Sequence, residues 1–268
     1  MKKTQSKSTF WIGGKHSVLA TIQNPQRKIH KIVLHEKLSN DNLEYINNHK
    51  VKIIYQGDKF FNKIFKSEIP HQGYAAEIEE LPYVDFKEFI KQLKKNKKFI
   101  NIIALDGIND PRNIGSIIRS SLAFNIDGLL INKKDCNSKS YTLYKAASGA
   151  IETIPVFKVS NIIHEINFLK SENFWLLALE SNAKHSLYDY KVEQNNVIIF
   201  GSEENGIRNI VKDTADYICK IPMNPKANSL NVSNACSATL AIINYLQKQK
   251  THSHFVWVGL VIINLILN

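Results

Sequence analysis

The chain has 268 residues, 44% of them hydrophobic and 22% charged, which is enough for one large domain or two ordinary ones with a real core. Its formal net charge of +11 is unevenly spread: residues 1–73 hold 13 Lys and Arg against 5 Asp and Glu, whereas residues 99–250 hold 16 against 14. A basic excess at one end favours a polyanionic partner, and nucleic acid is the first candidate. A lysine-rich solvated surface explains the same excess.

Cysteine spacing and the two chain ends argue against a metal site, a secretory signal and a membrane span. Cys136, Cys219 and Cys236 lack the spacing of metal ligands, and we expect reduced thiols in a cytoplasmic protein. The basic N-terminus has no apolar stretch behind it. Residues 255–268 are uncharged, but 14 residues are fewer than the roughly 20 of a span. We expect this apolar tail, taken as residues 251–268, to be a docking strand, a helix or an extension, with membrane anchoring as the less favoured alternative.

Residues 1–75 are predicted to form a small α/β domain. Apolar spacing and capping residues predict helices at 15–23, 39–49 and 57–65 and strands at 28–35 and 52–56. Seven lysines punctuate the segment: Lys15, Lys28, Lys31, Lys52, Lys59, Lys63 and Lys66. They form either a solvated face or a platform that follows RNA phosphates. Residues 76–98 are predicted to be a linker that contains one helix, at 84–95.

Residues 99–250 are predicted to form a second α/β domain. Six apolar strands are expected at 99–106, 126–132, 156–159, 174–181, 197–203 and 217–222. Helices are expected between and after them at 113–124, 141–154, 161–173, 207–215 and 230–249. This alternation predicts a parallel sheet with helices on both faces. The sequence has neither a glycine-rich dinucleotide fingerprint nor a Walker A motif, so NAD and ATP are disfavoured as ligands.

Three polar loops follow strands of this sheet, and we expect them to build one active site, because ligands bind at the carboxyl ends of such strands. In the first loop, Pro111 and Asn113 predict a helix start with Asn113 as the N-cap, and Gly115 permits close approach. Arg119 lies on the same helix and can return toward this end. Its guanidinium suits a phosphate, with a surface ion pair as the alternative.

The second and third loops are rich in Gly, Ser, Asn and Glu. Glu203, close after Gly201, either caps the next helix or directs its carboxylate at a ligand hydroxyl. Ser229 and Asn231 are good N-caps for the final helix. However, residues 228–234 supply five Ser and Asn, more than one cap needs. Neutral hydrogen-bonding groups together with an arginine favour catalysis by positioning over hydrolysis.

Three stretches, DPRNIGSIIR, IIFGSEENGI and CKIPMNPKANSLNVSNACSATL, closely resemble in this order the signature motifs of the SpoU/TrmH family of RNA ribose 2'-O-methyltransferases. The similarity covers roughly residues 99–249. The basic first segment, with GGKHSVLATI near its start, resembles the L30e-like substrate-binding domain of the ribosomal-RNA branch.

The resemblance implies S-adenosylmethionine as methyl donor, an RNA substrate, a homodimer, and a parallel sheet with a trefoil knot, the SPOUT fold. It matches Gly201, Ile221 and Leu230 to cofactor-contacting positions, with Met223 as a neighbouring wall. It matches these residues to the polar positions of the catalytic site: Asn113, Arg119, Glu203, Ser229 and Asn231. The domain ahead of the catalytic one favours a guanosine of 23S ribosomal RNA as the target. No metal ion is expected in the site. Transfer RNA, or a non-catalytic role as an RNA-binding assembly factor, are the alternatives.

Overall fold

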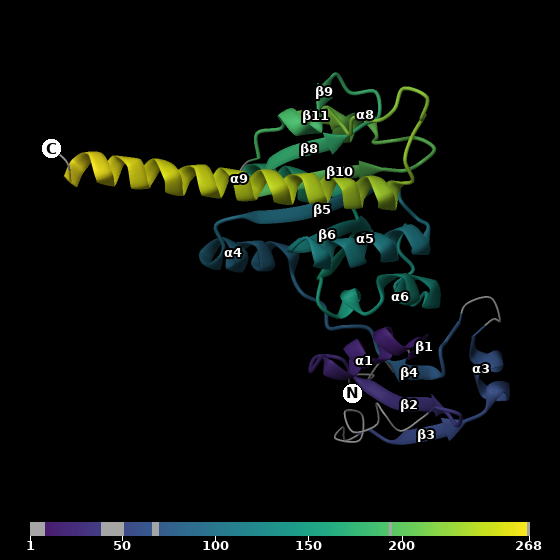
Figure 1. Cartoon of the computed structure of the whole chain (residues 1–268). Coiled ribbons are helices and arrows are strands. Elements are labelled where there is room, and N and C mark those ends of the chain that lie inside the picture. Colours follow the sequence, from purple (N-terminus) through teal and green to yellow (C-terminus); the bar gives the residue numbers. More distant parts are fainter. Residues whose placement is uncertain (1–8, 39–50, 66–69, 193–194, 267–268) are drawn as a thin grey trace, which may run out of the picture.

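The computed structural model describes residues 9–38, 51–65, 70–192 and 195–266, with side chains as far as Gln249. Figure 1 shows a small N-terminal sheet below a larger sheet, with the long final helix across the upper one. The predicted α/β class, with one parallel sheet, is confirmed. The helix predicted at 39–49 lies outside the described residues. The trefoil knot stays a prediction.

The N-terminal domain has a four-stranded sheet in the order β1-β4-β2-β3. Its elements are β1 (Phe10–Gly13), α1 (Lys15–Gln23), β2 (Ile29–His35), β3 (Ile53–Gln56), α3 (Asp58–Ile64) and β4 (Tyr74–Ile78). The two predicted strands and the helices at α1 and α3 are confirmed. The sequence did not predict β1 and β4, which are short and pair antiparallel with each other. Because β4 crosses the predicted limit at residue 75, the domain continues into the segment that was predicted to be a linker.

The rest of that segment contains α4 (Phe86–Asn96), where a helix was predicted. Asp85 caps α4, since its carboxylate accepts a hydrogen bond from the Glu88 amide at 2.9 Å. Phe86 and Ile90 are buried against the larger sheet, in one core with strands β5 and β10. Thus α4 belongs by its packing to the second domain.

The second domain is built on a seven-stranded sheet in the order β7-β6-β5-β10-β8-β11-β9, and all its pairings are parallel. The strands are β5 (Ile100–Asp106), β6 (Gly128–Asn132), β7 (Val156–Val159), β8 (Trp175–Leu179), β9 (His185–Ser186), β10 (Asn195–Gly201) and β11 (Tyr217–Lys220). Six of them match predicted strands, whereas β9 is a two-residue strand in a predicted loop. Their residues alternate between two buried cores, one on each face of the sheet.

Helices cover both faces of this sheet, as predicted. They are α5 (Pro111–Ala123), α6 (Tyr141–Ala147), α7 (Ile162–Ser171), α8 (Asn209–Lys212) and α9 (Val232–Ile266), with short 3-10 turns η2 (Ala150–Glu152) and η3 (Leu187–Asp189). Side chains of α5 and α9 join the first core, and those of α4 and α7 join the second.

Two predicted helix features are wrong. The helix predicted at 141–154 ends at Ala147, because Ser148 and Gly149 have left-handed backbone angles with φ of 49° and 91°. Helix α5 is capped by Asp110, whose carboxylate accepts from the Arg112 amide at 2.8 Å. Asn113, predicted as the cap, already lies inside the helix, so its side chain is available for other contacts.

Helix α9 continues past the predicted domain limit at residue 250 as far as Ile266. Its C-terminal part extends beyond the sheet in Figure 1. The apolar tail is therefore helical up to that residue, which is one of its expected forms. Among the described residues, no helix is both long enough and apolar enough to cross a membrane.

Candidate active site

The three predicted loops leave the same edge of the larger sheet. β10 lies between β5 and β8, and Gly201 at its end is in register with Asp106 at the end of β5. β11, which precedes the third loop, pairs with β8 on the other side. The carboxyl ends of parallel strands meet at one edge, so the expected convergence of the loops is observed.

A cavity of about 630 Å³ opens between the second and third loops. Its lining includes every residue that was predicted to contact a cofactor: Gly201, Ile221, Met223 and Leu230. It also includes three of the five predicted catalytic residues: Glu203, Ser229 and Asn231. The remainder is a mixture of apolar side chains, such as Leu179 and Val232, and polar ones, such as Asn182. Such a mixture suits a ligand with both apolar and polar parts.

Gly201 is required at the base of the second loop by close backbone packing. A Cβ atom at this position would lie 2.1 Å from the carbonyl carbon of Gly206 and 2.2 Å from the Ile207 nitrogen. The loop is closed by two backbone hydrogen bonds between Ser202 and Gly206, of 3.1 and 2.9 Å. Gly206 has a φ of 62°, which favours glycine. These contacts hold the loop, and Glu203 within it, against the end of β10.

Asn113, Glu203 and Asn231 form a hydrogen-bonded triangle that joins the three loops. The Asn231 amide donates to Glu203 Oε1 at 2.7 Å and to Asn113 Oδ1 at 3.0 Å, and Asn113 Nδ2 donates to Glu203 Oε1 at 3.1 Å. Asn231 also caps α9, because its Oδ1 accepts from the Ser233 amide at 3.0 Å. The capping role and the site role that the sequence offered as alternatives are therefore combined in one side chain.

Ser229 and Arg119, the other two catalytic candidates, lie outside this hydrogen-bonded triangle. Ser229 lines the cavity and is exposed. Arg119 is exposed on α5 outside the cavity lining, and it forms no hydrogen bond or ion pair with the described part of the chain. Its neighbour Ser120 meets Ser237 of α9, with 2.6 Å between the hydroxyl oxygens. The structure thus brings four of the five catalytic candidates together and leaves Arg119 exposed on α5, outside the cavity lining.

Two ion pairs near the site were not predicted. Asp106, at the buried end of β5, accepts from the backbone and side chain of Arg208, with Nε to Oδ1 at 2.8 Å. The hydrogen bond with Asp106 raises the pKa of the Arg208 guanidinium. Glu180 and Lys212, both in the cavity lining, are paired at 2.8 Å. The strand ending in Asp106 was visible in the sequence, but no local pattern identified its partner 102 residues away.

Two family patterns and several known proteins match this chain. The pattern of the SpoU rRNA Methylase family matches residues 100–241, and that of the RNA 2'-O ribose methyltransferase substrate-binding domain matches residues 11–84. A protein of Staphylococcus aureus (strain COL), named as a TrmH family tRNA/rRNA methyltransferase, is 36% identical over 84% of this chain and 92% of its own. A relative of the same name from Staphylococcus epidermidis is 34% identical over 84% and 91%.

The fold is shared with solved structures of lower sequence identity. The SpoU methyltransferase AviRb from Streptomyces viridochromogenes, solved with AdoMet, superimposes with a TM-score of 0.76 at 19% identity over 89% of this chain and 90% of that one. An AdoMet-bound rRNA methyltransferase from Sinorhizobium meliloti gives 0.69 at 18% identity over 88% and 87%. Together, the matched patterns and relatives show that the chain belongs to the SpoU/TrmH family of RNA methyltransferases.

Proposed function

We propose that this protein transfers a methyl group from S-adenosylmethionine to a ribose 2'-hydroxyl of ribosomal RNA. The observation that carries the proposal is the cavity at the ends of β10 and β11, with the triangle of Asn113, Glu203 and Asn231 at its polar side. The family supports RNA methylation, and the AdoMet complexes of AviRb and of the Sinorhizobium meliloti enzyme support the choice of cofactor.

The cavity fits S-adenosylmethionine in volume and in chemistry. At about 630 Å³ it is within the usual range for small-molecule sites. Ile221, Met223 and Leu230 would hold the apolar parts of the cofactor. At the end of β10, Gly201 has no side chain, so the cavity wall there is formed by the backbone. When bound, S-adenosylmethionine supplies an electrophilic methyl group on a sulfonium.

The polar residues have distinct roles in this proposal. Arg119 remains protonated at any ordinary pH, so it acts as a cation and not as a base. We assign it to the RNA phosphate beside the target ribose, where its charge stabilises the developing alkoxide. Ser229 and Asn231 orient the ribose hydroxyl. Glu203 and Asn113 hold Asn231 in place through hydrogen bonds of 2.7 and 3.0 Å.

A guanosine of 23S ribosomal RNA is the proposed target, because a substrate-binding domain precedes the catalytic domain. The Sinorhizobium meliloti rRNA methyltransferase matches 88% of this chain, whereas a tRNA-modifying enzyme of A. aeolicus matches 61%. Primer extension at low dNTP, on RNA from cells with and without the protein, tests this choice. Loss of one stop in ribosomal RNA supports it, and loss of a stop in transfer RNA alone overturns it.

A homodimer and a cytoplasmic location belong to the same proposal. The dimer is supported by apolar side chains on two neighbouring helices: Leu122 on α5 is 40% exposed and Tyr245 on α9 is 61% exposed. Exposed apolar side chains on neighbouring helices are candidates for burial in a subunit interface. The location is proposed because ribosomal and transfer RNA are the substrates in the names of the relatives. Light scattering after size-exclusion chromatography tests the dimer, and a monomeric mass would refute it.

A further inference from the structure

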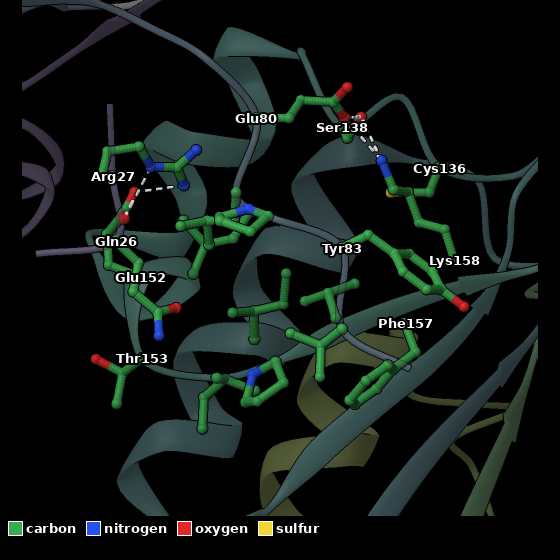
Figure 2. Close-up of a pocket in the computed structure, with 18 of the residues that line it drawn as sticks. Gln26, Arg27, Glu80, Tyr83, Cys136, Ser138, Glu152, Thr153, Phe157 and Lys158 are labelled. Carbon is green, nitrogen blue, oxygen red and sulfur yellow. Dashed lines mark hydrogen bonds and ion pairs between the residues drawn. The ribbon is translucent and has the colours of Figure 1, made fainter. Parts of the chain in front are cut away.

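The contact between the two domains contains an ion pair that is almost fully buried. The side chain of Arg27, just after α1, is 0% exposed, and that of Glu152, in η2, is 3% exposed. Arg27 donates to both carboxylate oxygens of Glu152, at 3.0 Å from Nε and 2.8 Å from Nη2. Figure 2 shows this paired geometry at one end of a cavity between the domains. Removing one member of such a pair leaves a buried charge without compensation.

Further donors from the N-terminal domain complete the environment of Glu152. Thr21 Oγ1 donates to Oε1 at 3.0 Å, and Asn24 Nδ2 donates to Oε2 at 2.9 Å. Arg27 Nη2 also donates to the Tyr144 hydroxyl of α6 at 3.3 Å. Burial alone would lower the pKa of Arg27, but Tyr144 and Glu152 outweigh it and raise that pKa. We call Thr21, Asn24, Arg27 and Glu152 the interdomain clamp.

The segment that joins the domains is also fastened at its start. Glu80 accepts from Lys158 of β7 at 2.7 Å and from the Ser138 hydroxyl. Beyond Glu80 the segment crosses a cavity of about 380 Å³ that both domains line, as Figure 2 shows. Tyr83 in this segment is 87% exposed. The segment therefore spans the interface as an exposed connection, and the clamp lies beside it.

The clamp is connected to the catalytic residues by close packing. Ser17 Oγ of α1 donates to the Tyr144 carbonyl of α6 at 2.9 Å. On its other side α6 packs tightly on α5, because a Cβ on Gly115 would lie 2.5 Å from the Leu143 carbonyl oxygen. Helix α5 carries Asn113 and Arg119. Rigid contacts thus run from the N-terminal domain through α6 to the helix that holds the proposed RNA cation.

We propose that Arg27 and Glu152 are positioning residues that hold the N-terminal domain in one pose relative to the methyl-transfer cavity, so that the enzyme selects RNA long enough to contact both domains. The inference rests on the proposed function. If the domains are already held in one pose, RNA binding does not have to order them, so the affinity for RNA is higher. A short RNA that contacts only the catalytic domain gains nothing from the clamp.

Glu152→Gln tests this inference, with Glu172→Gln as a matched control. The control removes the Lys94–Glu172 ion pair, of 2.6 Å, which lies within the catalytic domain. For Glu152→Gln we expect KM to rise about tenfold for a structured ribosomal RNA fragment that spans both domains, equal to about 1.4 kcal/mol. Three values should remain unchanged. They are the KM for a short oligonucleotide that carries the same target ribose, the kcat, and the affinity for S-adenosylmethionine. Glu172→Gln should move none of these values.

A second variant opens the same interface without replacing either member of the ion pair. In Gly149→Ala the new Cβ would lie 2.6 Å from the Ala20 Cβ, at a backbone φ of 91°. It should produce the same KM pattern even if Glu152→Gln fails to fold. In both variants chymotrypsin should cut after Tyr83 faster than in the wild type, which is a readout independent of activity.

Equal rises in KM for long and short RNA, or no change in either, would overturn the positioning role. Unchanged cleavage after Tyr83 in both variants would show that the clamp does not hold the domains in their pose. If the wild type transfers no methyl group to any RNA, the proposed function fails, while the chymotrypsin comparison still decides whether the clamp holds the domains.

Discussion

Asn231 performs two roles that different substitutions can separate. Its Oδ1 caps α9, and its Nδ2 donates to Glu203 and Asn113. Aspartate is an equally good cap, but an ionised carboxylate cannot donate and would repel Glu203. Alanine removes both functions.

We therefore expect Asn231→Asp to keep most of the melting temperature but to lower methyl transfer about tenfold to a hundredfold, as for a lost hydrogen bond to a charged group worth about 1.5–3 kcal/mol. Asn231→Ala should lose activity and also about 1 kcal/mol of stability. Asn161 caps α7 through a hydrogen bond of 3.1 Å to the Ile163 amide, away from the cavity lining. Asn161→Ala should thus lose stability alone. If activity and stability fall together in all three variants, Asn231 is only a cap.

Arg119 is the residue whose role depends most on RNA. It lies outside the cavity lining and has no ion pair within the described residues. Arg119→Ala should reduce methyl transfer by about a hundredfold or more, typical of losing a donor to a developing oxyanion, and should leave the affinity for S-adenosylmethionine unchanged. Calorimetry and a transfer assay measure the two effects. Lys91→Ala, on the exposed side of α4, serves as the control for loss of a cation. Loss of cofactor binding in Arg119→Ala would contradict the assignment.

The polar residues of the site could be predicted from the sequence, but the hydrogen bonds between them could not. The resemblance to the family identified Asn113, Glu203 and Asn231 as polar site residues. Their hydrogen bonds join positions that are 90, 28 and 118 residues apart, so no local pattern contains them. The capping error at Asn113 has a local cause: Asp and Asn are equally good caps, and Pro111 at the first helical position indicates Asp110 instead.

At the scale of elements, the second loop depends on the absence of a side chain at Gly201. In Gly201→Ala the new Cβ would overlap the backbone of Gly206 and Ile207, at 2.1 and 2.2 Å, so the loop must shift. We expect a loss of about 1–3 kcal/mol in stability, as for other overpacked sites, and an affinity for S-adenosylmethionine lower by about tenfold or more.

Gly57→Ala is the control for this substitution. Its φ is −87°, and its new Cβ would approach only the flexible carboxylate of Glu36, at 2.9 Å. Calorimetry and thermal unfolding of both variants decide the matter. A Gly201→Ala protein that binds the cofactor like the wild type would show that the loop does not shape the cavity.

Element prediction succeeded where apolar runs are long and failed where strands are short. β5 and β10 are buried along almost their whole length and were visible as continuous apolar runs. β1 has four residues and β4 has five, and they pair with each other across more than sixty residues of sequence, with β4 also pairing with β2. The end of α6 at Ala147 was not predicted, because Ser148 adopts a left-handed backbone conformation that is uncommon for serine.

At the scale of the whole molecule, the two domains share one core and are not separate bodies on a flexible linker. Phe10 and Val18 of the N-terminal domain belong to the same cluster as Leu143 and Tyr144 of the catalytic domain. The sequence showed the composition of each domain and the basic excess of the first. It could not show that Arg27 and Glu152 are paired, because isolated charged residues are most often solvated.

The most direct test of the methyltransferase assignment is transfer of tritium from methyl-labelled S-adenosylmethionine to RNA, followed by digestion to nucleosides and chromatography. The wild type should place the label in a 2'-O-methylnucleoside of ribosomal RNA, and Arg119→Ala should place almost none. Label in a base-methylated nucleoside would contradict the ribose assignment. A wild-type protein that binds S-adenosylmethionine but labels no RNA would contradict the catalytic role.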